Sequence, residues 1–179
     1  MSDKYYYHVV TNKKMYIGQK INFNENNNSG VYTRVMEKLP IVEDIYNNPS
    51  KYNQESLEHH TKVALRELAM EEVRKSTYPN YPSRLASLYV STNLEDANMW
   101  ANSFLNKGRD VLQIVKVKTN GNSFQGNSYN CFEGTISKEK NISLSYAYWN
   151  NDNTKTENVL YETIIDGEIE VVEIIKEFI

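Results

Sequence analysis

The sequence predicts an α+β domain built on a mostly antiparallel sheet with flanking helices. Segments typical of strands lie near both ends of the chain, and segments typical of helices lie between them. This order favours antiparallel pairing over the regular strand–helix alternation of a parallel sheet. The chain has 179 residues, and domains usually run to about 100–200 residues. We therefore expect residues 1–179 to form one domain.

The N-terminal half contains one predicted strand and one long predicted helix. Residues 5–10 are aromatic and β-branched, which is typical of a strand. Residues 55–75 form the longest predicted helix, because their apolar positions fall on one helical face: Leu57, Ala64, Leu65 and Leu68. The pairs Tyr78-Pro79 and Tyr81-Pro82 end this helix, since a residue before proline disfavours helical geometry. The asparagine-rich run 22–30 predicts a mobile loop.

The central segment has the clearest local signals. Residues 85–91 predict a strand, and Thr92-x-x-Glu95 has the form of a capping box that opens a helix. Gly108 follows that helix at the position of a left-handed C-terminal cap. Residues 111–117 alternate between two faces and predict a half-buried strand.

The C-terminal segment predicts two strands joined by a turn. Residues 159–165 and 168–175 have strand character, and Asp166-Gly167 between them is a pair typical of tight hairpin turns. The polar stretch 149–158 before these strands predicts a loop.

Composition excludes several classes of protein. The 20 basic and 23 acidic side chains give a formal charge of −3, which disfavours a non-specific nucleic-acid binder. The single cysteine, Cys131, excludes an internal disulfide and a cysteine-rich metal site. No run approaches the roughly 18 apolar residues of a membrane span, and the N-terminus lacks the features of a signal peptide. We therefore expect a cytoplasmic protein without a membrane partner.

Three short motifs do not support the chemistry that they suggest. The spacing of Gly121 and Gly126 matches a phosphate-binding loop, but Asn127 and Ser128 follow where the motif needs lysine. His59 and His60 point about 100° apart on a helix, so they do not chelate one metal ion. Ser137-x-x-Lys140 lacks the partner motifs of a serine acyl-enzyme. We expect no metal cofactor.

Three separated segments carry a resemblance to a known superfamily. They are Tyr7-His8-Val9-Val10, residues 89–100 and residues 160–169. In order, they supply a Tyr-His strand, a strand ending in Ser-Thr, a helix with Ala-x-x-aromatic, and a late strand with a glutamate. This set resembles the His-Tyr-Glu branch of the ADP-ribosyltransferase superfamily, shared by diphtheria-type toxins and poly-ADP-ribose polymerases. Within it, residues 71–74 and 81–85 resemble the bacterial domain of unknown function 2441. The resemblance implies a split antiparallel sheet and NAD as substrate.

Glu162 is the residue that the resemblance implies to be catalytic. Cleavage of the nicotinamide–ribose bond develops oxocarbenium character on the ribose, and a carboxylate beside the anomeric carbon stabilises that charge. Glu162 alternates with Leu160 and Ile164, so it projects from an otherwise apolar strand face. The alternative is a solvated residue at a sheet edge.

The resemblance implies further contacts with NAD. His8 would hydrogen-bond the adenosine-side ribose or orient the dinucleotide, and the alternative is an ordinary strand histidine. Val9, where many members have glycine, would offer its backbone to the nicotinamide amide. Trp100 and Tyr89 would hold the flat nicotinamide ring by stacking, and the alternative for Trp100 is a core aromatic residue.

Three polar residues complete the implied site. Ser91 and Thr92 would support Glu162 by hydrogen bonding. Arg84 is the best cation for the pyrophosphate, because a planar guanidinium pairs well with phosphate oxygens. The alternative for Arg84 is an ion pair with the preceding helix.

Several functions follow from these expectations. The first is an NAD-dependent mono-ADP-ribosyltransferase, acting as an intracellular bacterial or phage toxin or defence effector on a protein or nucleic acid; an antitoxin or immunity protein would be a partner. The second is an NAD glycohydrolase. The third is an inactive nucleotide- or protein-binding module, or a purely structural domain. Position 160 is Leu where arginine-modifying members carry an acid, so arginine is not favoured as acceptor. Residues 22–30 and 121–134 are the expected substrate-facing loops.

Overall fold

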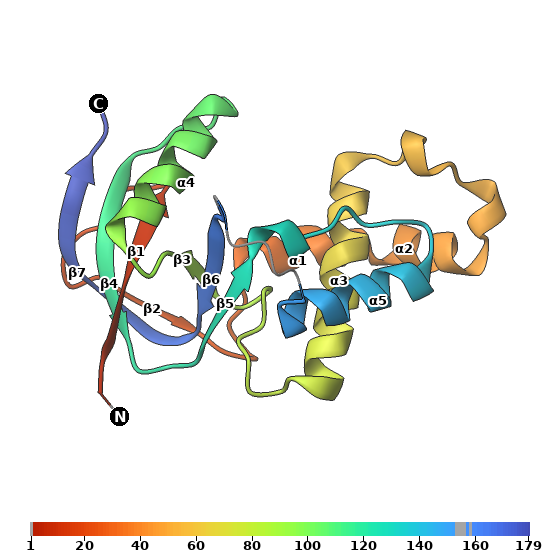
Figure 1. The fold of residues 1–179 in the computed structure, drawn as a ribbon, viewed down its shortest axis with the longest axis horizontal. Helices are drawn as coiled ribbons and strands as arrows, with labels where there is room; N and C mark the ends of the chain where they lie inside the picture. Colours follow the sequence, from red (N-terminus) through yellow and green to blue (C-terminus); the bar gives the residue numbers. More distant parts are fainter. Residues whose placement is uncertain (1, 153–156, 158) are drawn as a thin grey trace.

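Two antiparallel sheets form the framework of the protein (Figure 1). The computed structural model describes residues 2–152, 157 and 159–179. In these residues the first sheet has the order β1-β4-β7-β2, with bounds Lys4–Val10, Gln113–Thr119, Gly167–Glu177 and Lys20–Phe23. The second has the order β3-β6-β5, with bounds Leu88–Val90, Tyr161–Ile165 and Ser123–Asn127. This arrangement confirms the α+β class and the split antiparallel sheet.

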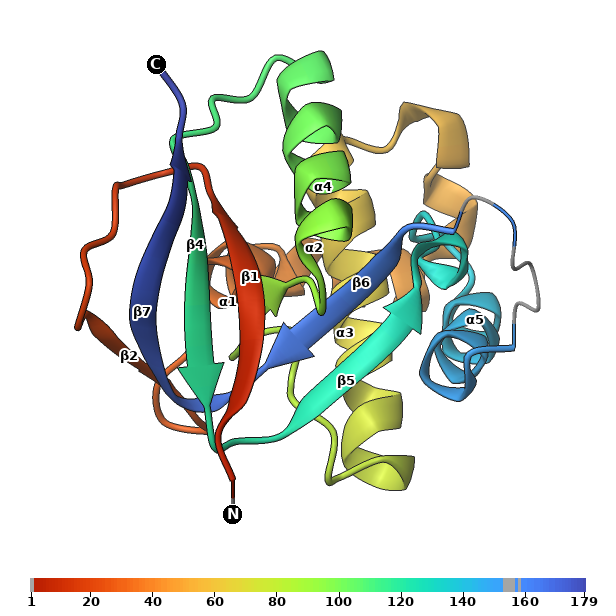
Figure 2. The ribbon, with the colours of Figure 1, turned by 60° about the vertical axis from the view of Figure 1, so that its left-hand side comes forward.

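The two sheets meet at one backbone pairing and at one chain crossing. Tyr7 of β1 pairs with Ser91, which follows β3, through N–H···O distances of 2.9 and 2.7 Å. At the crossing, β6 passes into β7 through Asp166 beside the link from β4 to β5 (Figure 2). A Cβ on Gly121 would lie 2.2 Å from the Asp166 carbonyl oxygen. Glycine at position 121 is therefore required by the close approach of the two links.

The turn predicted at Asp166-Gly167 has the expected backbone but joins different partners. Gly167 has a φ of +74°, which glycine adopts without strain. However, β6 and β7 belong to different sheets. The two predicted strands and the turn are therefore present, but the strands on each side of the turn pair with other strands rather than with each other.

Helices cover the two sheets on different sides (Figure 1). Helix α4 (Leu94–Asn106) packs on the first sheet, where Ala97 and Ala101 contact Val9 and Ile114. Four helices lie beside the second sheet: α1 (Gly30–Glu37), α2 (Leu39–Asn47), α3 (His59–Thr77) and α5 (Lys138–Asn150). Short 3-10 turns occupy 49–51, 54–56 and 128–130. Within the described ranges, no helix is long and apolar enough to cross a bilayer.

The long predicted helix is confirmed, with a later start. Helix α3 begins at His59 because the Glu58 side chain caps it, accepting hydrogen bonds from the backbone N–H of His60 and Thr61 at 3.1 and 3.2 Å. It ends at Thr77, directly before the predicted Tyr78-Pro79 stop. Residues 54–56 form a separate 3-10 turn.

Two predictions for the central segment need correction. The strand predicted for 85–91 is shorter, and α4 is capped by Asn93, whose side chain accepts a hydrogen bond from Asp96 N at 2.8 Å. The capping box at Thr92 is therefore wrong by one residue, because Asn93 offers its oxygen one position closer to the helix. The left-handed Gly108 after the helix is confirmed, with a φ of +74°.

The polar stretches contain more regular structure than predicted. Run 22–30 includes the end of β2 and the start of α1, and stretch 121–134 includes β5. Stretch 149–158 begins inside α5, where Trp149 is 2% exposed and donates from Nε1 to the Met70 carbonyl oxygen at 2.9 Å. The remainder, 153–156 and 158, lies outside the described residues. Long-range packing, which local composition does not report, orders the described parts of these segments.

Candidate active site

A cleft of about 580 Å³ opens where the two sheets diverge. Ligand sites are commonly clefts of about 300–1,000 Å³. Its lining residues come from β1 and α4 on one side, from α1 and the first half of α3 on the other, and from β3 and β6. Figure 1 shows where these elements lie in the fold. Seven of the eight sequence-predicted site residues line this cleft: His8, Val9, Arg84, Tyr89, Ser91, Trp100 and Glu162.

Glu162 occupies the fork between the two sheets. On β6 it pairs with Gly126 of β5, whereas the pairing of β6 with β3 ends one residue later, at Thr163. Beyond that point the chain after β3 turns away, and Ser91 pairs with β1. The side chain of Glu162 is only 14% exposed, so it is not a solvated edge residue.

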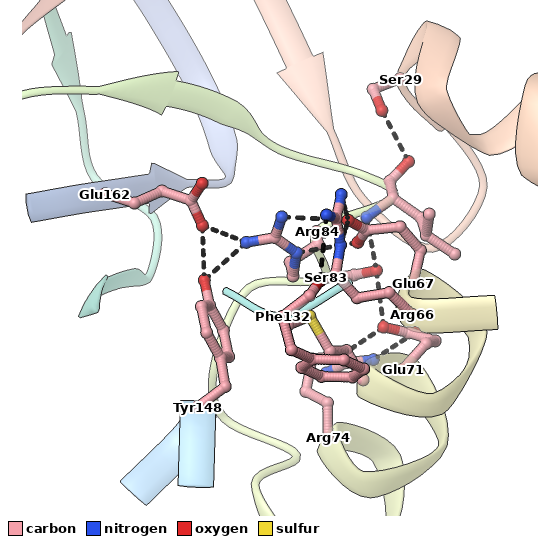
Figure 3. Close-up of polar contacts among 12 residues, drawn as sticks. Ser29, Arg66, Glu67, Glu71, Arg74, Ser83, Arg84, Phe132, Tyr148 and Glu162 are labelled. Atoms are coloured by element: carbon pink, nitrogen blue, oxygen red, sulfur yellow. Dashed lines mark hydrogen bonds and ion pairs between the residues drawn. The ribbon is translucent and has the colours of Figure 1, made fainter. Parts of the chain in front are cut away.

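Two side chains hold the Glu162 carboxylate (Figure 3). Its Oε1 accepts a hydrogen bond from Tyr148 at 2.8 Å and forms an ion pair with Arg84 Nη1. Its Oε2 has no hydrogen-bond partner among the described residues. The carboxylate is therefore fixed through one oxygen, and the other is available to a ligand.

Arg84 lies at the centre of a buried charge network (Figure 3). It is 3% exposed and donates from Nε and Nη2 to the Glu67 carboxylate at 2.8 and 3.0 Å. Its Nη1 also donates to the Tyr148 hydroxyl at 2.6 Å. The guanidinium lies over the rings of Tyr89 and Tyr148, at 5.4 and 5.0 Å from their centroids. Because Glu67 belongs to α3, the ion pair with the preceding helix is present.

Electrostatics favour the charged forms of Arg84 and Glu67. Burial alone would lower the pKa of Arg84, but the carboxylates of Glu162 and Glu67 raise it well above its usual range. Burial likewise acts to raise the pKa of Glu67, and the cations Arg84 and Arg66 outweigh it and hold that pKa below its usual value. The charge of Arg84 in the cleft is therefore already balanced by the carboxylates of Glu67 and Glu162.

His8 presents a neutral imidazole to the cleft. Its Nδ1 lies 2.7 Å from the Tyr89 carbonyl oxygen, so Nδ1 carries the proton and donates it. Burial lowers the pKa of His8, and the bond to Tyr89 opposes this only in part. The remaining nitrogen, Nε2, is then a hydrogen-bond acceptor.

The backbone N–H and C=O of Val9 have no hydrogen-bond partner among the described residues. In an antiparallel strand, alternate residues direct their backbone groups to the same edge. Tyr7 pairs with Ser91 across the edge facing β3, while Val10 accepts from Leu112 on the β4 side. The N–H and C=O of Val9 therefore point to the edge facing β3, two residues beyond the last pairing there.

Two aromatic residues line the cleft without being buried in the core. Tyr89 and Trp100 are both half-buried, so the alternative of a purely structural, fully buried role does not describe them. Trp100 donates from Nε1 to the Tyr161 carbonyl oxygen at 2.9 Å and packs at 5.7 Å from the ring of Phe104. This bond ties the indole to the residue directly before Glu162.

The predicted support of Glu162 by Ser91 and Thr92 is wrong. Ser91 is buried and engages Tyr7 through its backbone. Thr92 is exposed, lies outside the cleft lining and accepts a hydrogen bond from Gln125 at 3.4 Å. Arg84 and Tyr148 take this role instead, and after Val90 the chain turns to pair with β1 through Ser91.

Sequence reasoning missed Glu67 and Tyr148. Glu67 lies on the long predicted helix, where an acidic residue ordinarily indicates a solvated face. Tyr148 lies in a helix that was not predicted. No local pattern marks either residue, although both are nearly inaccessible to solvent. Among the described residues, no group of three or more His, Cys, Asp or Glu is placed to hold a metal ion.

Together, the fold and the site define an α+β protein whose ligand-sized cleft lies at the split of two antiparallel sheets. Comparison with known families matches residues 6–177 to the family described as a protein of unknown function, DUF2441. Since the match covers nearly the whole chain, the protein belongs to this family. A search among curated proteins finds no match.

Proposed function

We propose that this protein is an NAD-dependent mono-ADP-ribosyltransferase. The observation that carries the proposal is the convergence of three distant segments in one cleft. His8 of β1, Tyr89 of β3 and Glu162 of β6 line it, together with Trp100 of α4. By the sequence resemblance, these residues would correspond to the positions that the His-Tyr-Glu branch uses for NAD.

The proposed chemistry centres on the free oxygen of Glu162. In the transfer step the bond between the ribose anomeric carbon and the nicotinamide nitrogen breaks, and nicotinamide leaves with the bonding electrons. A nucleophile of the acceptor then forms the new bond to that carbon and loses its proton. Oε2 of Glu162 would hydrogen-bond a ribose hydroxyl and stabilise the positive charge that develops.

Neighbouring groups suit the two ends of the dinucleotide. The Nε2 of His8 would accept a hydrogen bond from the adenosine-side ribose. The unpaired backbone of Val9 would bind the nicotinamide amide, while Tyr89 and Trp100 hold the ring. Because this contact would use the backbone N–H and C=O, which valine and glycine both carry, valine at position 9 keeps both groups.

The acceptor is a protein or a nucleic acid. Leu160 stands where arginine-modifying members carry an acid, so arginine is not favoured. A transferase of this type acts where NAD is present, inside a cell, and fits a toxin or defence effector whose producer makes a neutralising partner.

The test uses NAD labelled in its adenosine part, incubated with the purified protein with and without cell lysate. We expect label on a macromolecule in the lysate and none with Glu162→Gln. Nicotinamide release without lysate and without label transfer would make the protein a glycohydrolase. No release in either condition by the folded protein would reject both enzymes and favour a binding module.

A further inference from the structure

The basic side chains that line the cleft are arginines, although lysine is the more common basic residue in the chain. The sequence has five arginines and fifteen lysines. Four of the arginines line the cleft (Arg34, Arg66, Arg84 and Arg109), and no lysine in the described part of the chain does so. A guanidinium pairs with phosphate oxygens through a planar fork and is more weakly hydrated than an ammonium. The distribution therefore indicates a phosphate-bearing ligand.

Two of these arginines are already neutralised. Arg84 binds Glu67 and Glu162, and Arg66 donates to Glu67 from Nε and Nη2 at 3.0 and 2.9 Å. In the described residues, Glu67 and Glu162 are also the only acids that line the cleft. The two carboxylates thus balance two of the four cations. The other two arginines leave a positive charge of about two for a ligand.

The remaining charge belongs to Arg34 and Arg109, which lie on opposite walls. Arg34, on α1, is exposed and has no carboxylate within ion-pair distance in the described residues. The acid that caps the neighbouring helix, Glu58, is occupied by Lys38 at 3.0 Å. The hydrogen bond from Lys38, with that from the His60 backbone, lowers the pKa of Glu58 to about 2.

Arg109, which follows α4, is oriented but not neutralised. Its guanidinium lies 4.3 Å from the centroid of the Phe104 ring, and Nη2 donates to Thr11 at 3.3 Å. These contacts hold the side chain and cancel none of its charge. Four of its five N–H groups remain for a ligand.

Two buried hydroxyls in the cleft lining also lack partners. Ser87 and Thr163 are 3% and 2% exposed, and neither hydroxyl oxygen has a hydrogen-bond partner in the described residues. Buried polar groups are nearly always paired. Their presence independently indicates that the cleft receives a polar, hydrogen-bonding occupant.

We infer that Arg34 and Arg109, rather than Arg84, bind the phosphate groups of the ligand from opposite walls of the cleft. The ligand carries about two phosphate charges, as a nucleoside diphosphate or the pyrophosphate of a dinucleotide does. The phosphodiesters of a nucleic-acid acceptor have the same chemistry, and the experiment separates these two sources. The inference concerns binding and does not require that NAD be cleaved.

The experiment measures the dissociation constants of ADP and adenosine by calorimetry for the wild type, Arg34→Gln and Arg109→Gln. We expect each substitution to weaken ADP binding by about 10-fold or more, the scale of one lost hydrogen bond to a charged group. Adenosine binding should change little, because it has no phosphate. A variant at an exposed site away from the cleft, Lys140→Gln, removes the same charge and should leave ADP binding unchanged.

A second arm uses a short single-stranded oligonucleotide as the probe. Binding of the oligonucleotide but not of ADP, lost in both arginine variants, would assign the phosphates to a nucleic acid. The inference is overturned if neither probe binds the folded wild type. It is equally overturned if the arginine variants weaken ADP and adenosine alike, or if Lys140→Gln matches their effect. ADP binding without NAD cleavage would reject the proposed function and leave this inference standing.

Discussion

Replacement of Arg84 by methionine tests the buried charge network most sharply. Methionine keeps the unbranched shape of the side chain and removes its charge. The change strips Glu67 of two hydrogen bonds, at 2.8 and 3.0 Å, and deprives Glu162 of its ion pair. Glu67 retains Arg66, with contacts at 3.0 and 2.9 Å.

The expected cost follows from the burial of these groups. Glu67 is 2% exposed and Arg84 3%, so water does not replace the lost partner. Removing one member of a buried pair costs about 3–5 kcal/mol, because a charge is left without compensation. Domains are stable by about 5–15 kcal/mol, so Arg84→Met should fold but unfold at much lower denaturant. Arg84→Lys should recover only part of the loss, because one ammonium does not form the same fork.

Urea denaturation at several pH values is the assay. In the wild type the folded pKa of Glu67 lies below its ordinary value of 4.5, because Arg84 and Arg66 outweigh burial. The resulting stability is present above about pH 4.5 and is lost as the pH falls through the folded pKa. Arg84→Met lacks most of this contribution of the Glu67 carboxylate to the free energy of unfolding. The difference in free energy of unfolding should therefore be largest near neutral pH and should narrow below about pH 4.5.

The matched surface control is Lys20→Met, which breaks the exposed pair of Lys20 with Glu168 and should barely move the unfolding midpoint. A cost for Arg84→Met below about 1 kcal/mol, in the range of a surface pair, would refute the reasoning. So would a cost that does not change with pH.

Two further predictions concern elements that position the cleft. Asn93→Ala removes the cap of α4 and should lower the free energy of unfolding by about 1 kcal/mol, measured by thermal or urea denaturation. Thr92→Ala, the control, should have a small effect. A larger loss for Thr92→Ala than for Asn93→Ala would contradict the assignment of the cap. Trp149→Ala opens a cavity among the rings of Tyr78 and Tyr81, which follow α3, Phe124 of β5 and Tyr148 of α5, and should cost about 3–5 kcal/mol. A loss of unfolding free energy no larger than that of Tyr16→Ala, at an exposed tyrosine, would show that this aromatic cluster does not stabilise the core.

Sequence patterns correctly predicted the elements that are determined by residues adjacent in the chain. The strand at 5–10, the proline stop after α3 and the left-handed Gly108 depend on residues adjacent in sequence. Helix α5 was not predicted because its first two turns bury polar rather than apolar residues. Asn141 and Ser145 are fully buried there, and Asn141 is satisfied by Tyr46, 95 residues away, and by Thr135. A hydrophobic pattern does not report a face that is stabilised by distant hydrogen bonds.

The same difference between local and long-range causes separates the predicted from the unpredicted residues of the candidate site. His8, Trp100 and Glu162 were predicted from an ordered set of motifs, and they do share one cleft. The partners of Glu162 were not predicted, because Arg84 and Tyr148 reach it only after α3, α5 and β6 have packed together. The two residues assigned to that role, Ser91 and Thr92, follow β3 at the point where the chain turns to pair with β1.

The measurement that tests the central claim most directly is the rate of nicotinamide release from NAD for three proteins, each assayed at a temperature where it is fully folded. They are the wild type, Glu162→Gln and Glu168→Gln, the last being an exposed glutamate on β7 that loses the same charge outside the cleft. We expect Glu162→Gln to lower the rate by about 100-fold or more, the scale of one lost transition-state stabiliser, and Glu168→Gln to match the wild type. Equal rates for all three proteins would contradict the assignment of Glu162 as the catalytic carboxylate.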